Sequence, residues 1–119
     1  MTPCGQKIRQ LRADKNVTQQ QQADFLGVSK AYISALENGA RGKPSAVFVD
    51  QICVWLGLIW DDAEELKRLA NLSHPKPVID VRKHSSNAVM LANILAQNVE
   101  RLDDADCEYI LTALEKRLR

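Results

Sequence analysis

The segment from Thr18 to Gly39, TQQQQADFLGVSKAYISALENG, constrains the fold more than any other part of the chain. Thr18 and Gln21 have the spacing of a T-x-x-Q capping box, which predicts a helix beginning at Gln19. The apolar residues of that helix end at Gly27, which is suited to the left-handed conformation at a helix C-terminus. Part of the glutamine run is therefore the start of a helix.

A second short helix follows this glycine turn directly. Ser29 is a natural N-cap, and Ile33 and Leu36 have the spacing of one buried helical face. Gly39 is expected to end this helix, over residues 30–38, in the left-handed conformation. Two short helices joined by a glycine-containing turn can lay the second one in the major groove of DNA.

Further helices are predicted on both sides of this pair. One covers residues 5–14, GQKIRQLRAD. Another, over the apolar stretch VDQICVWLGL, is implied by the family resemblance given below. A fifth helix is expected to run to about Asn71, with Asp61 as its N-cap and Trp60 in the position of a hydrophobic staple. These five helices form the first predicted domain, residues 1–73, of an all-α fold.

The rest of the chain is predicted to be a linker and a helical hairpin. Residues 74–87 contain two prolines and too few β-branched residues for an independent strand, so they are assigned as the linker. Residues 88–119 carry apolar residues at helical spacing on both sides of LDDAD, where Asp103 or Asp104 is expected to cap the second helix.

Two such helices alone bury little, so their apolar stripes need a second surface. Packing on another copy of the chain and packing on the first domain are both open, and we expect the first, because two-fold pairing doubles the contact of a helix-turn-helix with DNA. The predicted dimerisation residues are Leu91, Leu95, Val99, Leu102, Ile110 and Leu114.

Composition excludes several classes of protein. The 119 residues are 45% hydrophobic and 26% charged, as in globular proteins, and no apolar run reaches the ~18 residues of a membrane span. The N-terminus lacks the order of a signal peptide, so a cytoplasmic, nucleoid-associated location is expected. Three widely spaced cysteines without a C-x-x-C pair suggest neither a disulfide framework nor a zinc site, and no cofactor is expected. No phosphate loop or G-x-S-x-G motif indicates an enzyme.

The net charge of +1 hides an asymmetry along the chain. Residues 1–44 contain seven basic and three acidic residues, whereas residues 45–119 contain nine basic and twelve acidic ones. This distribution favours a polyanion as the partner of the N-terminal half alone.

The residue pattern of the first half resembles the helix-turn-helix of the phage repressor and Cro family, the regulators of the xenobiotic-response-element type. The residues that carry the resemblance are Ile8, Arg9, Leu11, Arg12, Thr18, Gln19, Ala23, Leu26, Gly27, Val28, Ser29, Ile33, Leu36, Glu37, Gly39 and Pro44. The resemblance implies that Arg12 and Glu37 form a structural ion pair. It also implies a set of DNA-binding residues: Gln19, Ser29, Lys30, Ala31, Tyr32, Ser34, Ala35, Asn38, Arg41 and Lys43.

Within this set the resemblance assigns separate roles. Gln19 would contact a phosphate, and Asn38, Arg41 and Lys43 would hold phosphates after the recognition helix. Lys30 can donate to guanine, whereas alanines can meet only a thymine methyl, so direct readout is expected to be sparse. A solvated helix surface remains the alternative for Lys30, Tyr32 and Lys43.

Two functions follow from these expectations. The first is a sequence-specific transcriptional regulator, a dimeric repressor that binds a palindromic operator in double-stranded DNA. The second is the antitoxin of a toxin-antitoxin pair, whose C-terminal hairpin binds a protein toxin.

Overall fold

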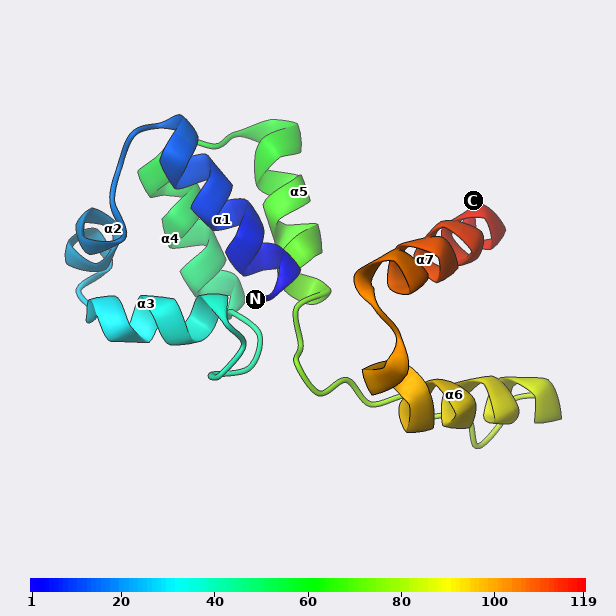
Figure 1. The fold of residues 1–119 in the computed structure, drawn as a ribbon. Coiled ribbons are helices and arrows are strands. Elements are labelled where there is room, and N and C mark those ends of the chain that lie inside the picture. Colours follow the sequence, from blue (N-terminus) through cyan, green and yellow to red (C-terminus); the bar gives the residue numbers. More distant parts are fainter. The chain divides into compact units, whose positions relative to one another are not determined.

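The computed structural model describes residues 1–119, and every regular element in it is a helix. The chain divides into two units, Met1–Pro77 and Val78–Arg119. The helices of the first unit are α1 (Pro3–Asp14), α2 (Gln19–Leu26), α3 (Lys30–Glu37), α4 (Ala46–Leu56) and α5 (Trp60–Asn71) (Figure 1). The second unit contains α6 (Ser86–Asn98), the 3-10 helix η1 (Val99–Arg101) and α7 (Asp104–Leu118). The all-α prediction is thus confirmed.

None of these helices combines the length and the apolar character needed to cross a membrane.

The ends of α2 and α3 follow the predicted capping pattern. Thr18 accepts a hydrogen bond from the backbone N–H of Gln21, and the Gln21 side chain accepts one from the Thr18 N–H at 2.8 Å. Gly27 ends α2 at φ +70°, a conformation that side chains with a Cβ rarely adopt. Ser29 caps α3 through the N–H of Tyr32. The capping box, the glycine C-cap and the serine N-cap are all confirmed.

The glutamines that follow Thr18 have different structural roles. Gln21 completes the capping box, and Gln20 donates to Asp24 one turn later at 2.9 Å. Gln22 is buried, and its carbonyl oxygen accepts a hydrogen bond from Nη1 of Arg12 at 2.6 Å. The glutamine run is therefore part of the folded first unit and contributes both to α2 and to its contact with α1.

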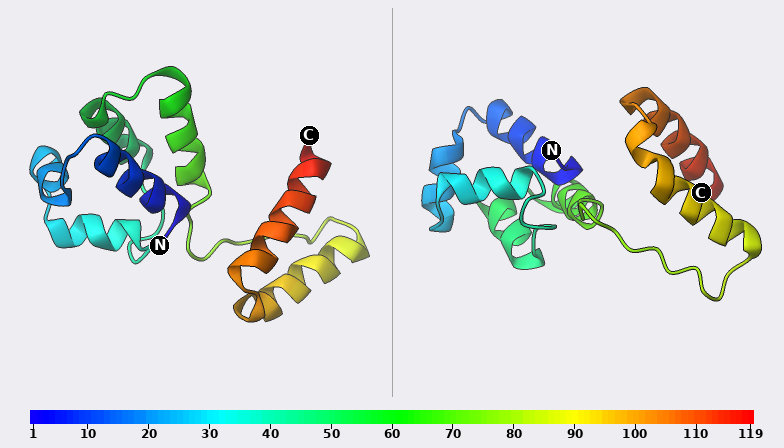
Figure 2. Two further views of the ribbon diagram at one scale, coloured as in Figure 1. Left: turned by 45° about the horizontal axis from the view of Figure 1, so that its top comes forward. Right: turned by 60° about the horizontal axis from the view of Figure 1, so that its bottom comes forward.

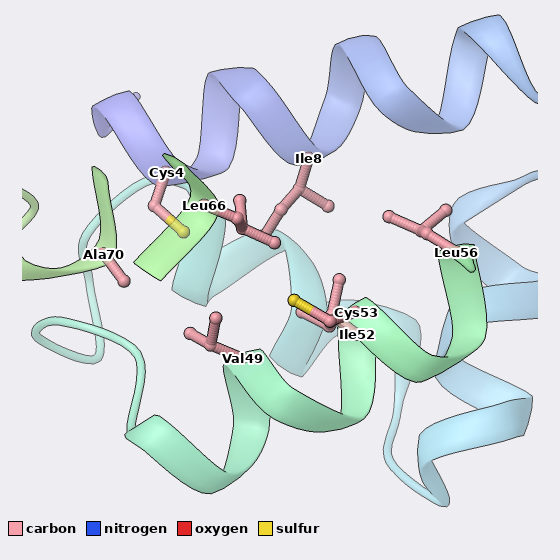
Figure 3. Close-up of a cluster of buried hydrophobic side chains, with 8 residues drawn as sticks. All are labelled: Cys4, Ile8, Val49, Ile52, Cys53, Leu56, Leu66 and Ala70. Atoms are coloured by element: carbon pink, nitrogen blue, oxygen red, sulfur yellow. The ribbon is translucent and has the colours of Figure 1, made fainter. Parts of the chain in front are cut away.

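The core of the first unit lies between α1, α4 and α5, and α5 packs against both of the other helices. Figure 3 shows Cys4 and Ile8 of α1 pointing toward the buried side chains of α4 and α5. The buried cluster consists of Cys4, Ile8, Val49, Ile52, Cys53, Leu56, Leu66 and Ala70. Burial of each large aliphatic side chain contributes about 1.5–3 kcal/mol. This cluster forms the scaffold that carries α2 and α3.

The first helix begins two residues earlier than predicted, at Pro3. Thr2 is its N-cap, because its hydroxyl accepts the N–H of Gly5 at 3.0 Å. The backbone N–H of Thr2 also donates to the carbonyl oxygen of Glu37 at 2.9 Å. The N-terminus of α1 is thereby bonded to the C-terminus of α3, an arrangement that Figure 2 shows in both views.

The predicted start of the fifth helix is wrong. Ile59 stands at the N-cap without a side-chain hydrogen bond, and Trp60 is the first helical residue, at φ +52°. Trp60 is 80% exposed, so it does not form the predicted hydrophobic staple. Asp61 lies in the first turn, where its negative charge interacts favourably with the positive end of the helix dipole, but it is not the N-cap.

The end of α3 also differs slightly from the prediction. The helix ends at Glu37, and Asn38 is its C-cap with φ −93°. Gly39 adopts the left-handed conformation one residue later, at φ +80°.

The second unit consists of two well-capped helices. Ser85 caps α6, which begins at Ser86 inside the stretch predicted as linker, because its hydroxyl accepts the N–H of Ala88 at 3.1 Å. Asp103, one of the two predicted candidates, caps α7 and forms a capping box with Asp106. No residue of this unit is buried.

Candidate nucleic-acid interface

One side of α3 faces outward, and the other side packs on the rest of the first unit. Ile33 and Leu36 are buried, and α3 packs against α1 and α2. The opposite side carries five predicted site residues: Lys30, Ala31, Ser34, Ala35 and Asn38. Lys30, Ala31 and Asn38 are exposed, and the other two are half-buried. Figure 1 shows α3 along an outer edge of the first unit, so this side is accessible.

A buried ion pair fixes α3 against α1. Arg12 donates to both carboxylate oxygens of Glu37, at 2.7 and 3.1 Å, and both side chains are buried. Gln19, the first residue of α2, donates its amide to the same carboxylate at 3.4 Å. Every buried polar side-chain atom has a hydrogen-bond partner. These contacts join three helices through one carboxylate, so the relative position of α2 and α3 is specified by side chains as well as by the turn.

Tyr32 lies at the edge of the exposed side of α3, not at its centre. Its ring makes an edge-to-face contact with Phe48 of α4, with centroids 6.4 Å apart. The guanidinium of Arg41 lies 5.3 Å from the same ring, within the range of a cation–π contact. The ring therefore packs against the exposed guanidinium of Arg41 and helps to fix its orientation.

The remaining predicted site residues make local hydrogen bonds. The hydroxyl of Ser29 caps α3, and the amide of Asn38 donates to the carbonyl oxygen of Ser34 at 2.9 Å. Nζ of Lys43 donates to Oδ1 of Asn71 in α5 at 3.1 Å. All three bonds are exposed, where water or a phosphate can compete for the donor.

Two residues that are not among the predicted DNA-binding residues lie beside them. Met1 and Arg9 line a surface depression together with Gln19, Ser34 and Asn38. Arg9 is exposed and follows the buried Ile8 on α1. The sequence signal was its position beside the apolar stripe of the first helix, but its closeness to α3 depends on the tertiary fold.

The buried thiols of this unit have a packing role. Burial, together with smaller contributions from the nearby Cys53 and Glu37, raises the pKa of Cys4 to about 11. The pKa of Cys53 is also raised, mainly by burial. Both thiols stay protonated at neutral pH, so neither is an activated nucleophile.

The sequence of the first unit matches that of known proteins. Residues 4–72 match the family model described as a helix-turn-helix domain. A protein of Bacillus subtilis (strain 168), described as an uncharacterized HTH-type transcriptional regulator, RghRB, is 36% identical over 62 residues, which are 52% of this chain and 45% of that protein. The HTH-type transcriptional repressor RghR of the same organism is 38% identical over 52 residues, which are 44% of this chain and 38% of that protein.

The matched part therefore spans less than half the length of either relative. No solved structure matches the chain significantly. The family match covers more than half of this chain and contains the capped pair α2 and α3 together with the three helices that support it. The chain belongs to the helix-turn-helix domain family.

Proposed function

We propose that this protein is a sequence-specific regulator of transcription that binds double-stranded DNA with α3 in the major groove. The observation that carries this proposal is the accessible side of α3, held on a rigid support by the buried pair of Arg12 and Glu37. A short helix presented in this way can enter the groove while α2 crosses the backbone. The family match and the regulators among the relatives support the same function.

Base recognition is assigned to the outward side of α3. Lys30 is exposed at the first position of the helix and donates to O6 and N7 of a guanine. Ala31 and Ala35 contact thymine methyl groups, and Ser34 lies between them on the same side. Because only Lys30 carries a long donor, few base pairs are read directly by this helix.

Phosphate contacts surround these base contacts and set the register of α3 on the duplex. Gln19, Asn38, Arg41 and Lys43 supply them from the start of α2 and from the segment after α3. We add Arg9 to this set, since it lines the same depression as Gln19 and Asn38. Tyr32 acts through its ring, which supports Arg41.

The regulator acts as a dimeric repressor on a palindromic operator. A single α3 covers only a short half-site, and two-fold pairing of the protein gives an operator of matching symmetry. The uncovered apolar residues of the second unit support this dimer, because they require a surface to pack against.

In the antitoxin alternative the first unit binds DNA in the same way, but the second unit binds a protein toxin in place of a second copy of the chain. Both relatives are described as transcriptional regulators, which favours the regulator. Co-purification of a protein encoded beside this gene would favour the antitoxin.

The proposed function is tested by selecting bound fragments from the source genome and footprinting the selected fragment over a range of salt concentrations. We expect protection of a palindrome whose half-sites are about one helical turn, ~34 Å, apart. Binding that is weak, steeply dependent on salt and indifferent to sequence would contradict the proposal.

A further inference from the structure

The second unit has apolar helices without a core. Not one of its residues is buried, although α6 and α7 are both complete, capped helices. Its helices and η1 expose eleven large apolar side chains: Val89, Met90, Leu91, Ile94, Leu95, Val99, Tyr109, Ile110, Leu111, Leu114 and Leu118. A soluble monomer rarely exposes so many large apolar side chains on so short a segment, so these side chains require a partner surface.

The α6 helix is apolar on more than one side. It carries no charged residue, and its half-buried residues are Ala88, Ala92 and Asn98. Met90 and Ile94 lie on the side of the helix away from Ala88 and Ala92 and are 55% and 53% exposed. A single neighbouring helix that packs on Ala88 and Ala92 therefore leaves Met90 and Ile94 uncovered.

The α7 helix is amphipathic, with acidic residues in its first turn and basic residues in its last turn. Cys107, Ile110, Leu111, Leu114 and Leu118 form one apolar stripe at helical spacing. The first turn carries Asp104 and Asp106 without a basic residue, whereas the last turn carries Lys116 and Arg117.

Two opposite charges lie on the same edge of this stripe. Asp106 and Arg117 are separated by three turns of helix, about 16 Å, and have nearly the same angular position. When two such helices pack antiparallel through their stripes about a two-fold axis, the same edges meet. Asp106 of each copy then lies beside Arg117 of the other copy. A parallel pair would instead set like charges at the same level.

We propose that the second unit binds a second copy of itself, with the two α7 helices antiparallel and joined by reciprocal pairs of Asp106 and Arg117. The charge pattern matches its own copy under two-fold symmetry, which makes the same chain the fitting partner. This inference names the interface of the dimer proposed above and rests on it.

The other edge of the stripe contributes little to the choice of partner. The same antiparallel register brings Asp104 beside Arg119 and Glu108 beside Glu115 of the second copy. One pair attracts and the other repels, so their effects offset each other. The orientation of the helices therefore depends on Asp106 and Arg117 together with the apolar stripe.

The test uses the full chain and two variants with the same change of charge. Arg117→Asp sets two acidic residues against each other at both ends of the interface, so the dissociation constant of the dimer should rise at least about tenfold at low salt. Lys116→Asp is the matched control, since Lys116 points away from the apolar stripe and should leave the constant within about twofold. Sedimentation equilibrium at micromolar concentrations gives both values.

A complementary pair of variants tests the geometry directly. Asp106→Arg should weaken the homodimer, and an equimolar mixture of Asp106→Arg and Arg117→Asp should form a heterodimer, detected by native mass spectrometry. Asp106 also belongs to the capping box of α7, so circular dichroism must show that the helix content of this variant is retained. If it is not, the comparison of Arg117→Asp with Lys116→Asp carries the test.

The outcomes separate this inference from the proposed function. A wild-type dimer that Arg117→Asp and Lys116→Asp affect equally would overturn the antiparallel α7 pairing and leave the dimer intact. A wild-type monomer, or a stable complex with a different protein in place of the dimer, would overturn both. Binding of the monomer to a DNA half-site is measured separately and reports only on α3.

Discussion

Arg12 of α1 and Glu37 of α3 form a buried ion pair in which the guanidinium binds both carboxylate oxygens. Gln22 accepts a further hydrogen bond from the same guanidinium at 2.6 Å. Replacing Glu37 with alanine leaves a buried cation without its counter-ion. We expect Glu37→Ala to lower the free energy of unfolding by about 3–5 kcal/mol, measured by urea denaturation.

A double variant distinguishes the loss of the pair from the stranding of one partner. In Arg12→Met/Glu37→Met neither charge is left without a partner. The free energy of unfolding should therefore fall by less than the sum of the losses in Arg12→Met and Glu37→Met. Additive losses would show that the two side chains contribute independently.

Local features of the fold were predictable because adjacent residues determine them. The capping box of Thr18 and Gln21, the glycine end of α2 and the serine cap of α3 depend on side chains within three or four residues. The start of α5 was predicted wrongly because Asp61 is a good capping residue by type. The helix instead begins at Trp60, two residues earlier, although Ile59 at its N-cap offers no side-chain hydrogen bond.

The spatial arrangement of the candidate site was only partly predictable. The family resemblance implied the pair of Arg12 and Glu37, but the contact of Tyr32 with Phe48 and Arg41 depends on how α4 packs beside α3. The position of Arg9 beside Gln19 depends on the same packing. Sequence periodicity gives the face of one helix, whereas distances between residues on different helices require the tertiary structure.

Gly5 allows α1 and α3 to approach closely. A β-carbon on Gly5 would overlap the carbonyl oxygen of Glu37 and lie 2.7 Å from its Cα. That carbonyl also accepts the N–H of Thr2, so it cannot move without breaking the bond. We expect Gly5→Ala to cost about 3 kcal/mol in the free energy of unfolding, at the upper end of overpacking effects.

Gly27→Ala is the matched control for this substitution. Gly27 has a positive φ but open space around it, so its loss should be limited to about 1–2 kcal/mol of backbone strain. Equal melting temperatures for the two variants would contradict the close approach at Gly5.

The stability of the first unit should fall at alkaline pH because of Cys4. Burial, with smaller contributions from Cys53 and Glu37, raises the pKa of this thiol from 9.0 to about 11, so between these values the unfolded chain loses the proton and the folded chain keeps it. The folded state is therefore favoured below pH 9 and loses this advantage as the pH rises through 11. Urea denaturation under reducing conditions should show a steeper decline from pH 9 to 10.5 in the wild type than in Cys4→Ala. Parallel declines would exclude Cys4 as the cause.

Lys30 and Lys43 should affect DNA binding in different ways. Loss of the base contact in Lys30→Ala should cost about 1–3 kcal/mol at the selected operator and little on random DNA. Lys43→Ala should weaken binding to both and lower the salt slope by about one, because one phosphate contact is lost. Fluorescence anisotropy with operator and random duplexes over a salt series measures both effects.

Lys67 of α5 provides the control, since it is bonded to Asp50 and Glu64 and lies on a helix that packs on α1 and α4. Lys67→Ala should leave both affinities within about twofold. Equal losses at operator and random DNA in Lys30→Ala would contradict the role in base recognition.

The ring of Tyr32, rather than its hydroxyl, should matter for DNA binding. The ring contacts Phe48 and lies beneath the guanidinium of Arg41, whose orientation it supports by about 0.5–1 kcal/mol. Tyr32→Phe keeps both contacts, so its operator affinity should stay within about twofold of the wild type. Tyr32→Leu removes the ring, and its affinity for operator and random DNA should fall together, as expected when a phosphate contact is weakened. A selective loss of operator binding in Tyr32→Phe would instead show that the hydroxyl reads a base.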